Sequence, residues 1–483
     1  MSVKFNFGAL TASEIASAVS GKLHLFGAAY NDTACTGIDI DSRAIGVGDI
    51  FVAIKGERVD GNDYIKSAVD SGCVCVISRC LPDNIASITG DFAIVVVTDP
   101  VVAVGDLAHY YKKRMNVRTI GVTGSVGKTT TKELIYAVLS EKFKVHKTEG
   151  NHNNELGLPL SIFGIASDCD AAVLEMGMSN FGEIARLSQI AEPDFGVITT
   201  IGSSHIETLG SRENICKAKM EIVEGMSEHG ELVLCGDEPL LLAYRCSKYN
   251  PTYVSVYNAE SEFRAVNVTY QNNSTSFDLL CNREIVANLT VPALGIHHVY
   301  SALFAYAIGL KFGLDADTIR QGFLNFKNAA MRQSIYEIGG VKIIDACYNA
   351  SPESMRASIE VLCELSKQEG GARKMALLGD MRELGCETRS LHEKLGEYVA
   401  EKKLDKLFTY GLAASSIASS AKKCGMPACD VYDNPDITDP IASGKAILSV
   451  IKPGDIILFK ASRAMAAEKI VGYLRENESK IRG

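Results

Sequence analysis

Short apolar runs alternate along the chain with amphipathic stretches of helical period. The alternation is most regular between residues 118 and 226, which favours a mostly parallel sheet covered by helices. Strand-like runs there occupy 118–124, 171–177 and 195–204, and helix-like runs occupy 132–143 and 214–226.

Related patterns lie on both sides of this region. Residues 1–112 contain strand-like runs at 49–56 and 92–99 and helix-like runs at 12–20 and 64–72. A third run begins near residue 329 and has strand candidates at 374–381, 406–411 and 455–462. The 483 residues fit about three domains at roughly 150 residues each. We predict an α/β protein with a smaller N-terminal α/β domain (1–112), a central P-loop mononucleotide-binding parallel sheet (113–325) and a C-terminal Rossmann-like α/β domain (326–483).

Composition narrows the class of partner and the compartment. The formal net charge of -9 and the pI near 5.6 provide no basic field, so nucleic acid is not an expected partner. No apolar run approaches the roughly 18 residues of a membrane span, and the N-terminus lacks a signal-peptide pattern. The fourteen cysteines show no CxxC pair and no paired spacing, which is typical of reduced thiols. We expect a cytoplasmic, monomeric protein.

The stretch "GVTGSVGKTTTKEL", residues 121–134, carries the strongest chemical signal. A strand ends near Thr123 and a helix begins near Lys128, and the glycines between them free backbone N–H groups to converge on one anion. Lys128 can reach outer phosphates, and the Thr129 hydroxyl can bind Mg²⁺. The spacing departs from the usual P-loop because Val122 stands where that pattern has its first glycine. The predicted nucleotide-binding residues are Gly124, Ser125, Gly127, Lys128, Thr129 and Thr130.

Further polar residues follow the next strand-like runs. Glu175 ends an apolar run beside the phosphate-binding strand, where its carboxylate would hold Mg²⁺; a solvated strand end is the alternative. His205 follows the next run and is expected at the same carboxyl edge of the sheet. Lys217 and Lys219 lie on the following helix, where spacing alone makes each a surface lysine. The loop with Asn153 and Asn154 suits a polar ligand or caps the next helix.

Together these segments resemble the Mur ligase family, the ATP-dependent amide ligases of peptidoglycan precursor synthesis. The TGSVGKTT turn, the NHNNELGLPL loop, the LEMG strand and the spacing from His205 to Lys219 fit that family. In the outer thirds, "DSRAIGVGDIFVAIKGERVDGNDYI", "YNASPESM", "LGDMRELG" and "KASRAMAAEKIV" resemble the members that add D-alanyl-D-alanine to UDP-N-acetylmuramoyl-tripeptide. The resemblance covers nearly the whole chain and implies a role in cell wall biogenesis, cell shape and cell division.

The resemblance also implies roles for individual residues. Lys128 would bind the β- and γ-phosphates of ATP, Thr129 and Glu175 would bind one Mg²⁺, and His205 would bind a second. Lys219 matches a lysine that family members carry as a carbamate, which converts a cation into a carboxylate-like metal ligand. Lys128, His205 and Lys219 are thus the expected catalytic residues. Arg332 is a further expected nucleotide contact, and the expected substrate contacts are Asp41, Ser42, Arg43, Asn153, Asn154 and Asn349.

The implied reaction activates a carboxylate with ATP. Phosphoryl transfer gives an acyl phosphate and ADP, and the amine of the dipeptide then attacks and displaces phosphate. The phosphate-binding turn and two Mg²⁺ would act by positioning and electrostatics. One domain would grip the UDP-sugar, one the ATP and one the dipeptide, and their closure would exclude water.

Some positions depart from the family pattern. His298 and Ser301 stand where "HNVxNA" has asparagines, Ala346 replaces an aspartate, Ala461 replaces the glycine of "KGSR", and Asn62 replaces a histidine. The phosphate and metal residues match, whereas ribose and adenine contacts differ. Weaker ATP affinity, an altered nucleotide preference or a paralogue without ligase turnover all fit. Another Mur-type ligase and a folylpolyglutamate-type ligase are the alternatives within the enzyme class. The sequence does not distinguish diaminopimelate from lysine in the tripeptide.

Overall fold

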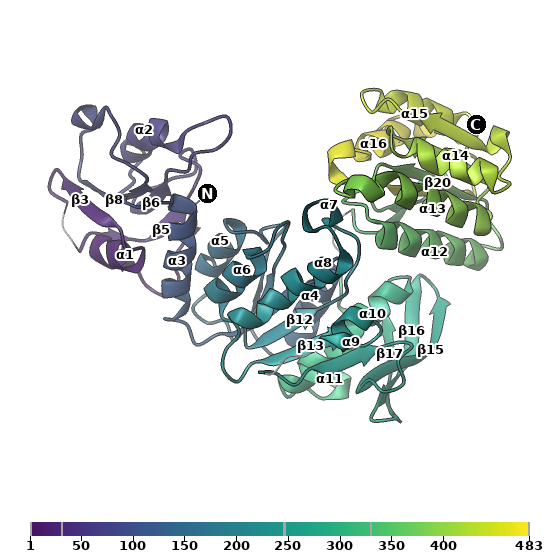
Figure 1. The fold of residues 1–483 in the computed structure, drawn as a ribbon, viewed down its shortest axis with the longest axis horizontal. Helices are drawn as coiled ribbons and strands as arrows, with labels where there is room; N and C mark the ends of the chain where they lie inside the picture. Colours follow the sequence, from purple (N-terminus) through teal and green to yellow (C-terminus); the bar gives the residue numbers. More distant parts are fainter. Residues whose placement is uncertain (1, 30–31, 245–247, 329–330, 482–483) are drawn as a thin grey trace. The chain divides into compact units, whose positions relative to one another are not determined.

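The computed structural model describes residues 2–29, 32–244, 248–328 and 331–481. The start of the third sequence run, at residues 329–330, lies outside this description. The chain is an α/β protein with three large sheets, as predicted (Figure 1). Its contacts separate two compact units: a first unit of Met1–Thr123, Lys142–Gly196 and Met220–Glu231, and a second unit of Gly124–Glu141, Val197–Lys219 and Leu232–Gly483. Because these units interleave along the chain, the predicted boundaries at 112/113 and 325/326 stay a prediction.

The N-terminal part of the first unit is built on a six-stranded sheet in the order β1-β5-β6-β7-β8-β3. The four central strands run parallel, and β1 and β3 pair antiparallel at the two edges. Its strands are β1 (Val3–Lys4), β3 (Lys22–Phe26), β5 (Gly37–Asp39), β6 (Asp49–Val52), β7 (Cys75–Ser78) and β8 (Phe92–Val96), with a separate pair of β2 (Leu10–Thr11) and β4 (Ala34–Cys35). The helices are α1 (Ala12–Ala18), α2 (Ile65–Asp70) and α3 (Pro100–Lys112). The runs predicted at 12–20, 49–56, 64–72 and 92–99 are therefore confirmed.

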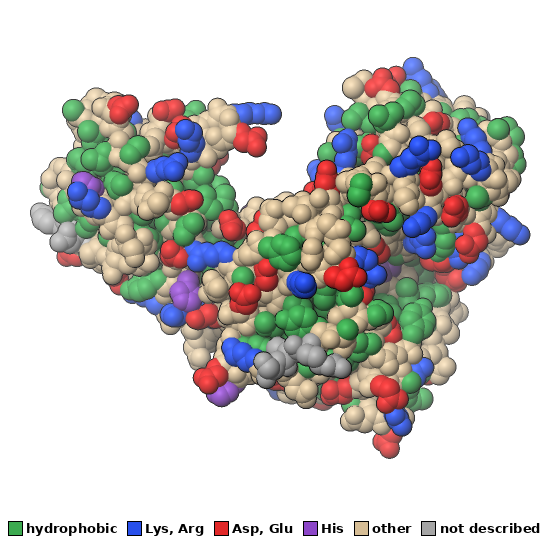
Figure 2. All heavy atoms as spheres, viewed as in Figure 1, with side chains coloured by type: hydrophobic (Ala, Val, Ile, Leu, Met, Phe, Trp, Pro, Cys, Tyr) green, Lys and Arg blue, Asp and Glu red, His purple; other side chains and the backbone are tan. Residues whose placement is uncertain are grey.

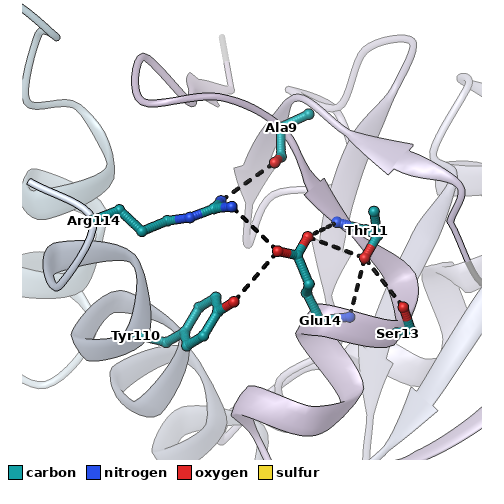
Figure 3. A network of polar contacts seen from close by, with 6 residues as sticks. All are labelled: Ala9, Thr11, Ser13, Glu14, Tyr110 and Arg114. Carbon is teal, nitrogen blue, oxygen red and sulfur yellow. Dashed lines mark hydrogen bonds and ion pairs between the residues drawn. The ribbon is translucent and has the colours of Figure 1, made fainter.

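A polar network fixes the start of α1 against the end of α3 (Figure 3). The Thr11 hydroxyl accepts a hydrogen bond from the Glu14 backbone N–H at 3.2 Å, and the Glu14 carboxylate accepts one from the Thr11 N–H at 2.8 Å. This reciprocal arrangement is a capping box. The other carboxylate oxygen of Glu14 lies 3.2 Å from an Arg114 nitrogen and accepts from the Tyr110 hydroxyl at 3.3 Å. The cap of one helix thus also anchors the helix packed beside it.

The remainder of the first unit contributes parallel strands β10 (Val145–Lys147), β11 (Ala171–Glu175) and β9 (Arg118–Thr123), in that order. Every residue of β11 is buried, as the continuous apolar run predicts for a strand covered on both faces. The predicted pairing of the 118–124 and 171–177 runs is confirmed, with Glu175 opposite Val122. Helices α5 (Gly157–Phe163) and α6 (Glu183–Ala191) and the 3-10 turn η3 (Glu221–Glu224) belong to this unit.

The central nine-stranded sheet has the order β10-β11-β9-β12-β13-β14-β15-β16-β17. Strand β12 (Phe195–Ile198) is shorter than the predicted run of 195–204, because the chain leaves the strand at Thr199 to contact the glycine turn. In the second unit, β15, β16 and β17 form an antiparallel meander that the sequence patterns did not predict. The elements here are α4 (Lys128–Leu139), α7 (Ile206–Leu209), α8 (Arg212–Met220), β13 (Glu231–Cys235), α9 (Pro239–Ala243), β14 (Thr252–Ser255), β15 (Phe263–Gln271), β16 (Ser274–Cys281), β17 (Glu284–Val291), α10 (Ile296–Lys311) and α11 (Ala316–Leu324).

The C-terminal part of the second unit has a six-stranded sheet in the order β18-β19-β23-β20-β21-β22. Only β18 pairs antiparallel, and buried apolar clusters occupy the region. The strands are β18 (Ser334–Ile338), β19 (Val341–Asp345), β20 (Lys374–Gly379), β21 (Lys406–Tyr410), β22 (Val431–Asn434) and β23 (Ile456–Lys460). The helices are α12 (Pro352–Gln368), α13 (Thr388–Glu401), α14 (Ser415–Lys423), α15 (Pro440–Leu448) and α16 (Glu468–Glu476). The predicted strands at 374–381, 406–411 and 455–462 are confirmed.

The structure also describes the surface charges, the helix lengths and the thiols. Acidic and basic side chains are intermixed on the face drawn in Figure 2. Within the described residues, no helix combines the length and apolarity needed to cross a bilayer. All the cysteines that the structure describes are free thiols.

Candidate nucleotide and metal site

The glycine turn occupies residues 124–127, between the end of β9 and the start of α4. Gly127 caps α4 with φ +88°, and Gly124 has φ +146°, a region that residues with a side chain rarely adopt. A Cβ on Gly124 would lie 1.9 Å from the Thr199 hydroxyl oxygen. The close approach of the loop after β12 therefore requires a glycine at this position.

Hydrogen bonds fix the turn against the start of that loop. The Ser125 N–H donates to the Thr200 carbonyl at 2.9 Å, and the Thr199 hydroxyl donates to the Val126 carbonyl at 2.6 Å. The Lys128 ammonium donates to the Gly124 carbonyl at 2.8 Å. The Ser125 hydroxyl is buried and has no hydrogen-bond partner among the described residues. Since buried hydroxyls are nearly always paired, this one is a ready donor for an anion held by the turn.

The first turns of α4 are tied to α10. Thr129 is buried, and Thr130 is partly exposed. The Thr131 hydroxyl donates to the Ser301 hydroxyl at 3.0 Å, and that hydroxyl donates to the His297 carbonyl at 3.2 Å. Ser301, one of the departures from the family pattern, therefore supports the helix that follows the glycine turn.

Glu175 and the asparagine loop belong to the first unit. Glu175 is 1% exposed, and one of its carboxylate oxygens accepts from the Asn153 side-chain amide at 2.9 Å. The Asn154 side-chain oxygen instead accepts from the N–H groups of Leu156 at 3.3 Å and Gly157 at 2.8 Å. Asn153 thus orients a buried carboxylate, whereas the Asn154 side chain bonds to the backbone at the start of α5.

His205 lies on the loop after β12, in the left-handed region with φ +65°. Its Nδ1 is 2.6 Å from an oxygen of Glu383, and this contact lowers the pKa of the Glu383 carboxyl. The Glu207 N–H donates to the Glu383 carbonyl at 3.2 Å. The motif at 378–385 therefore contacts the predicted metal ligand directly.

A second glutamate holds the same loop two residues earlier. The backbone N–H and the hydroxyl of Ser203 both donate to one Glu353 oxygen at 2.9 Å. Gly202 permits this contact, because a Cβ there would lie 2.8 Å from the Glu353 carboxyl carbon. Sequence reasoning missed Glu353, Glu383 and Thr199. Both glutamates lie inside motifs that the sequence analysis quoted, but no pattern indicates which backbone a loop glutamate faces.

The two lysines of α8 have opposite environments. Lys217 is exposed, whereas Lys219 is 2% exposed. Burial, with the nearby positive charge of Lys128 as a second cause, lowers the pKa of Lys219 well below its ordinary value. The expectation that spacing alone makes Lys219 a surface lysine is therefore wrong, because this face of α8 is turned into the protein.

Arg332, Asn349 and Lys460 lie close together in the second unit. The Arg332 guanidinium carbon is 3.9 Å from the Tyr348 ring centroid, and Lys460 donates to the Asn349 carbonyl at 3.0 Å. Burial, with the positive charge of Arg332 as a further cause, lowers the pKa of Lys460 to about 8. His297 lies near Lys460, and burial lowers the pKa of that imidazole to about 4. A basic group of this kind suits an anionic or electron-rich ligand.

Of the other departures from the family pattern, His298, Ala346 and Ala461 are buried, whereas Asn62 is partly exposed and its side-chain amide donates to the Cys80 sulfur at 2.9 Å. His298 is 1% exposed, and neither ring nitrogen has a hydrogen-bond partner among the described residues. Ala346 and Ala461 are buried in the C-terminal part of the second unit. The neighbouring Asp345 carboxylate accepts from the Cys347 N–H at 3.2 Å and the Tyr336 hydroxyl at 3.3 Å. These two contacts hold the Asp345 carboxylate beside Ala346.

The predicted UDP-sugar motif lies in the first unit, after β5. The Asp41 carboxylate accepts from the Arg43 side chain at 2.9 and 2.8 Å and from the Arg43 backbone N–H at 3.0 Å. These contacts lower the pKa of Asp41 to about 2. Ser42 is buried, while the Arg43 side chain is 87% exposed. Asp41 therefore presents Arg43 to solvent in a fixed orientation.

The donor set suits a metal that the nucleotide helps to hold. Among the described residues, no three His, Cys, Asp or Glu side chains form a metal-binding group. The second unit has a hydroxyl donor at Thr129 and an imidazole donor at His205, and the first unit has a carboxylate donor at Glu175. Mg²⁺ commonly takes one or two protein ligands and completes its shell with phosphates and water. The carboxylate of Glu175 and the hydroxyl of Thr129 are each of a chemical type that binds Mg²⁺ beside a phosphate.

Comparisons with known proteins agree with this arrangement. Three family models match in order: the catalytic domain of the Mur ligase family over residues 34–119, the Mur ligase middle domain over 122–309 and the Mur ligase glutamate ligase domain over 331–463. The UDP-N-acetylmuramoyl-tripeptide--D-alanyl-D-alanine ligase of Bacillus subtilis (strain 168) is 38% identical over 97% of this chain and 98% of the relative.

Solved structures are similar over the same extent. MurF from Acinetobacter baumannii gives a TM-score of 0.85 at 28% identity, covering 97% of this chain and 99% of that one. MurF ligase from Thermotoga maritima in complex with ADP gives 0.81 at 30% identity, covering 92% and 98%. The family model of the middle domain includes the glycine turn and the loop with His205, and the model of the glutamate ligase domain includes the two C-terminal motifs that contact this loop. With three successive domain models and full-length relatives in agreement, the chain belongs to the Mur ligase family.

Proposed function

We propose that this protein is an ATP-dependent ligase that joins D-alanyl-D-alanine to UDP-N-acetylmuramoyl-tripeptide in peptidoglycan precursor synthesis. The observation that carries the proposal is the direct hydrogen bonding of the glycine turn to the loop that bears His205. This contact supports the proposal, because it joins the turn proposed to bind phosphate to the loop that carries the side chain proposed to bind a metal. The similarity to the Bacillus subtilis ligase over 97% of the chain supports the substrates.

The turn and the start of α4 are proposed to hold ATP. The backbone N–H groups of the turn, apart from that of Ser125, which donates to the Thr200 carbonyl, would face the phosphates. The buried Ser125 hydroxyl, which has no partner among the described residues, would join them, with Thr130 beside it. Lys128 would exchange its Gly124 carbonyl partner for the β- and γ-phosphates. Arg332 would add a further contact to the nucleotide. A helix N-terminus and a lysine together stabilise the charge that moves during phosphoryl transfer.

The proposed Mg²⁺ ligands are Thr129, Glu175, His205 and a carbamylated Lys219. When bound, Mg²⁺ neutralises phosphate charge and polarises the transferred group. Asn153 orients the buried Glu175 carboxylate. Burial favours the neutral amine of Lys219, which is the form that reacts with CO₂. The addition forms an N–C bond and releases a proton, leaving an anionic carbamate in place of a buried cation.

The proposed reaction is the one that the family resemblance implies. The tripeptide carboxylate attacks the γ-phosphorus of ATP, and ADP leaves. The dipeptide amine then attacks the acyl phosphate, an amide forms, and phosphate leaves with loss of a proton from nitrogen. Both steps depend on positioning and electrostatic stabilisation.

Substrate recognition is proposed to follow the order of the domains. Asp41, Ser42 and Arg43 would contact the UDP-sugar, and Asn153, Asn154 and Asn349 would contact the peptide parts. The domain boundaries at 112/113 and 325/326, the cytoplasmic location and the monomeric state belong to the same proposal. Release of ADP requiring both UDP-tripeptide and D-Ala-D-Ala, with the amide product seen by mass spectrometry, is the expected result.

Two outcomes of this assay would replace the proposal. ADP release with UDP-dipeptide plus a diamino acid, or with a folate plus glutamate, would indicate another ligase of the group. ATP binding without turnover in any substrate combination would indicate a nucleotide-binding paralogue.

A further inference from the structure

His205 and Glu383 form a close side-chain pair within the second unit. His205 Nδ1 lies 2.6 Å from a Glu383 oxygen. Both residues have left-handed backbones, with φ +65° and +64°. Residues with a side chain rarely adopt this conformation unless the surrounding structure holds them in it. Two such residues facing each other indicate that their positions are specified by the fold.

Backbone contacts provide that support. The Glu207 N–H donates to the Glu383 carbonyl at 3.2 Å, so the segments touch through the main chain as well as through side chains. Gly385, with φ +53°, lies so close that a Cβ there would be 3.1 Å from the Glu207 Cα. The 3-10 turn η4 (Gly385–Glu387) thus fixes the carboxylate relative to the loop of His205.

The pair determines which imidazole nitrogen is free. A carboxylate accepts a hydrogen bond, so Nδ1 carries the proton and Nε2 keeps its lone pair. Metal-binding histidines commonly donate their second ring nitrogen to a carboxylate in this way. The Glu383 side chain is 56% exposed, so the pair adds little to stability, and its effect lies in geometry.

We propose that Glu383 is a positioning residue that holds His205 in the tautomer and ring orientation that present Nε2 to a divalent cation. The inference rests on the proposed metal role of His205. The motif at 378–385 supplies Glu383 and would therefore set the orientation of His205, the proposed metal ligand on the loop after β12. Metal binding would thus depend on the C-terminal part of the chain.

Binding of Mn²⁺ to the ADP-bound protein tests this without turnover, with Mn²⁺ as the spectroscopic probe for the Mg²⁺ site. The variants are Glu383→Ala, Glu383→Gln, His205→Ala and the double variant His205→Ala/Glu383→Ala. Glu387→Gln is the control, because Glu387 is exposed on the same turn. We expect His205→Ala to abolish one Mn²⁺ site. At that same site, Glu383→Ala should weaken the affinity for Mn²⁺ by about 10- to 100-fold. Glu383→Gln should lie between, and Glu387→Gln should equal wild type.

Each outcome decides the inference. If His205→Ala weakens Mn²⁺ binding and both Glu383 variants bind as wild type, Glu383 does not position the ligand. The inference is also wrong if Glu383 acts independently of His205. In that case the double variant would bind Mn²⁺ more weakly than His205→Ala by the same factor that separates Glu383→Ala from wild type. If His205→Ala itself leaves binding unchanged, the proposed metal role of His205 fails first, and the inference fails with it. Should Glu383→Ala melt far below wild type, Glu383→Gln provides the comparison.

Discussion

Replacing Glu353 by glutamine should loosen the loop that carries His205. In the structure one Glu353 oxygen accepts two hydrogen bonds from Ser203 at 2.9 Å, one from the backbone N–H and one from the hydroxyl. Glutamine keeps the shape and an acceptor oxygen but removes the charge. The substitution therefore isolates the charge-assisted part of the contact.

The size of the effect follows from these two bonds. A hydrogen bond to a charged group contributes about 1.5–3 kcal/mol and a neutral one about 0.5–1.5 kcal/mol, so two bonds lose about 2 kcal/mol in all. Glu353 also lies in the first turn of α12, where a negative charge adds about 0.5 kcal/mol through the helix dipole. The sum of about 2.5 kcal/mol corresponds to an opening equilibrium shifted by roughly 50-fold.

Amide hydrogen exchange measures that opening at the Ser203 N–H. In Glu353→Gln, exchange at Ser203 should be about 50-fold faster under conditions where exchange follows the opening equilibrium. Glu364→Gln is the matched control, since Glu364 lies on the same helix and pairs only with the exposed Lys367 among the described residues. Exchange at Ser203 within about threefold of wild type, or equal acceleration across the whole chain, would refute the reasoning.

Three further predictions concern the proposed site. Lys219→Ala should abolish most ligase activity, and short carboxylic acids, which replace the carbamate oxygens, should partly restore it. Lys217→Ala, at an exposed position, should leave ligase activity nearly unchanged. Full activity in Lys219→Ala would contradict the assignment. Lys128→Ala should leave thermal unfolding near wild type and lower ATP turnover by about 100-fold or more, and a loss under about tenfold would argue against a phosphate clamp. Arg43→Ala should raise the KM for the UDP-substrate and leave that for ATP within about twofold. The same variant should return the pKa of Asp41 from about 2 toward its ordinary 3.8, as followed by carboxyl NMR. Because the pKa of Asp41 is lowered in the folded state, the Asp41–Arg43 contact is fully present at pH values above the ordinary pKa of 3.8. The contact is lost as the pH falls through about 2. An unchanged pKa would show that Arg43 is not its cause.

Local patterns predicted the elements well where burial is uniform and poorly where a loop makes a specific contact. The β11 run was correctly assigned as a strand because all its residues are buried. The glycine turn was correctly placed between a strand and a helix, because only glycine tolerates the backbone conformation beside Thr199. The strand predicted over 195–204 stops at Ile198 because the following threonines bond to that turn. No periodicity of the 195–204 segment encodes a partner more than 70 residues away.

Lys219 shows the same limit for side chains. The periodicity of apolar and polar residues in α8 does not indicate that Lys219 is buried, because this pattern predicts lysines on the exposed face of a helix. The structure places it at 2% exposure. Only the family likeness distinguished it from Lys217, and the physical reason for the distinction appeared once the faces of α8 were known.

The environment of Lys219 also explains why the two lysines of the site need different chemistry. Burial lowers its pKa first, and the positive charge of Lys128 lowers it further. The role proposed for Lys128 as a phosphate clamp requires its positive charge, and that charge favours the neutral form of the buried Lys219. The positive charge of Lys128 repels an ammonium at Lys219 but attracts a carbamate there. Conversion of the neutral Lys219 amine to a carbamate is therefore favoured by this charge. The same pair of residues thus disfavours the ammonium form of Lys219 and favours the carbamate proposed as a metal ligand.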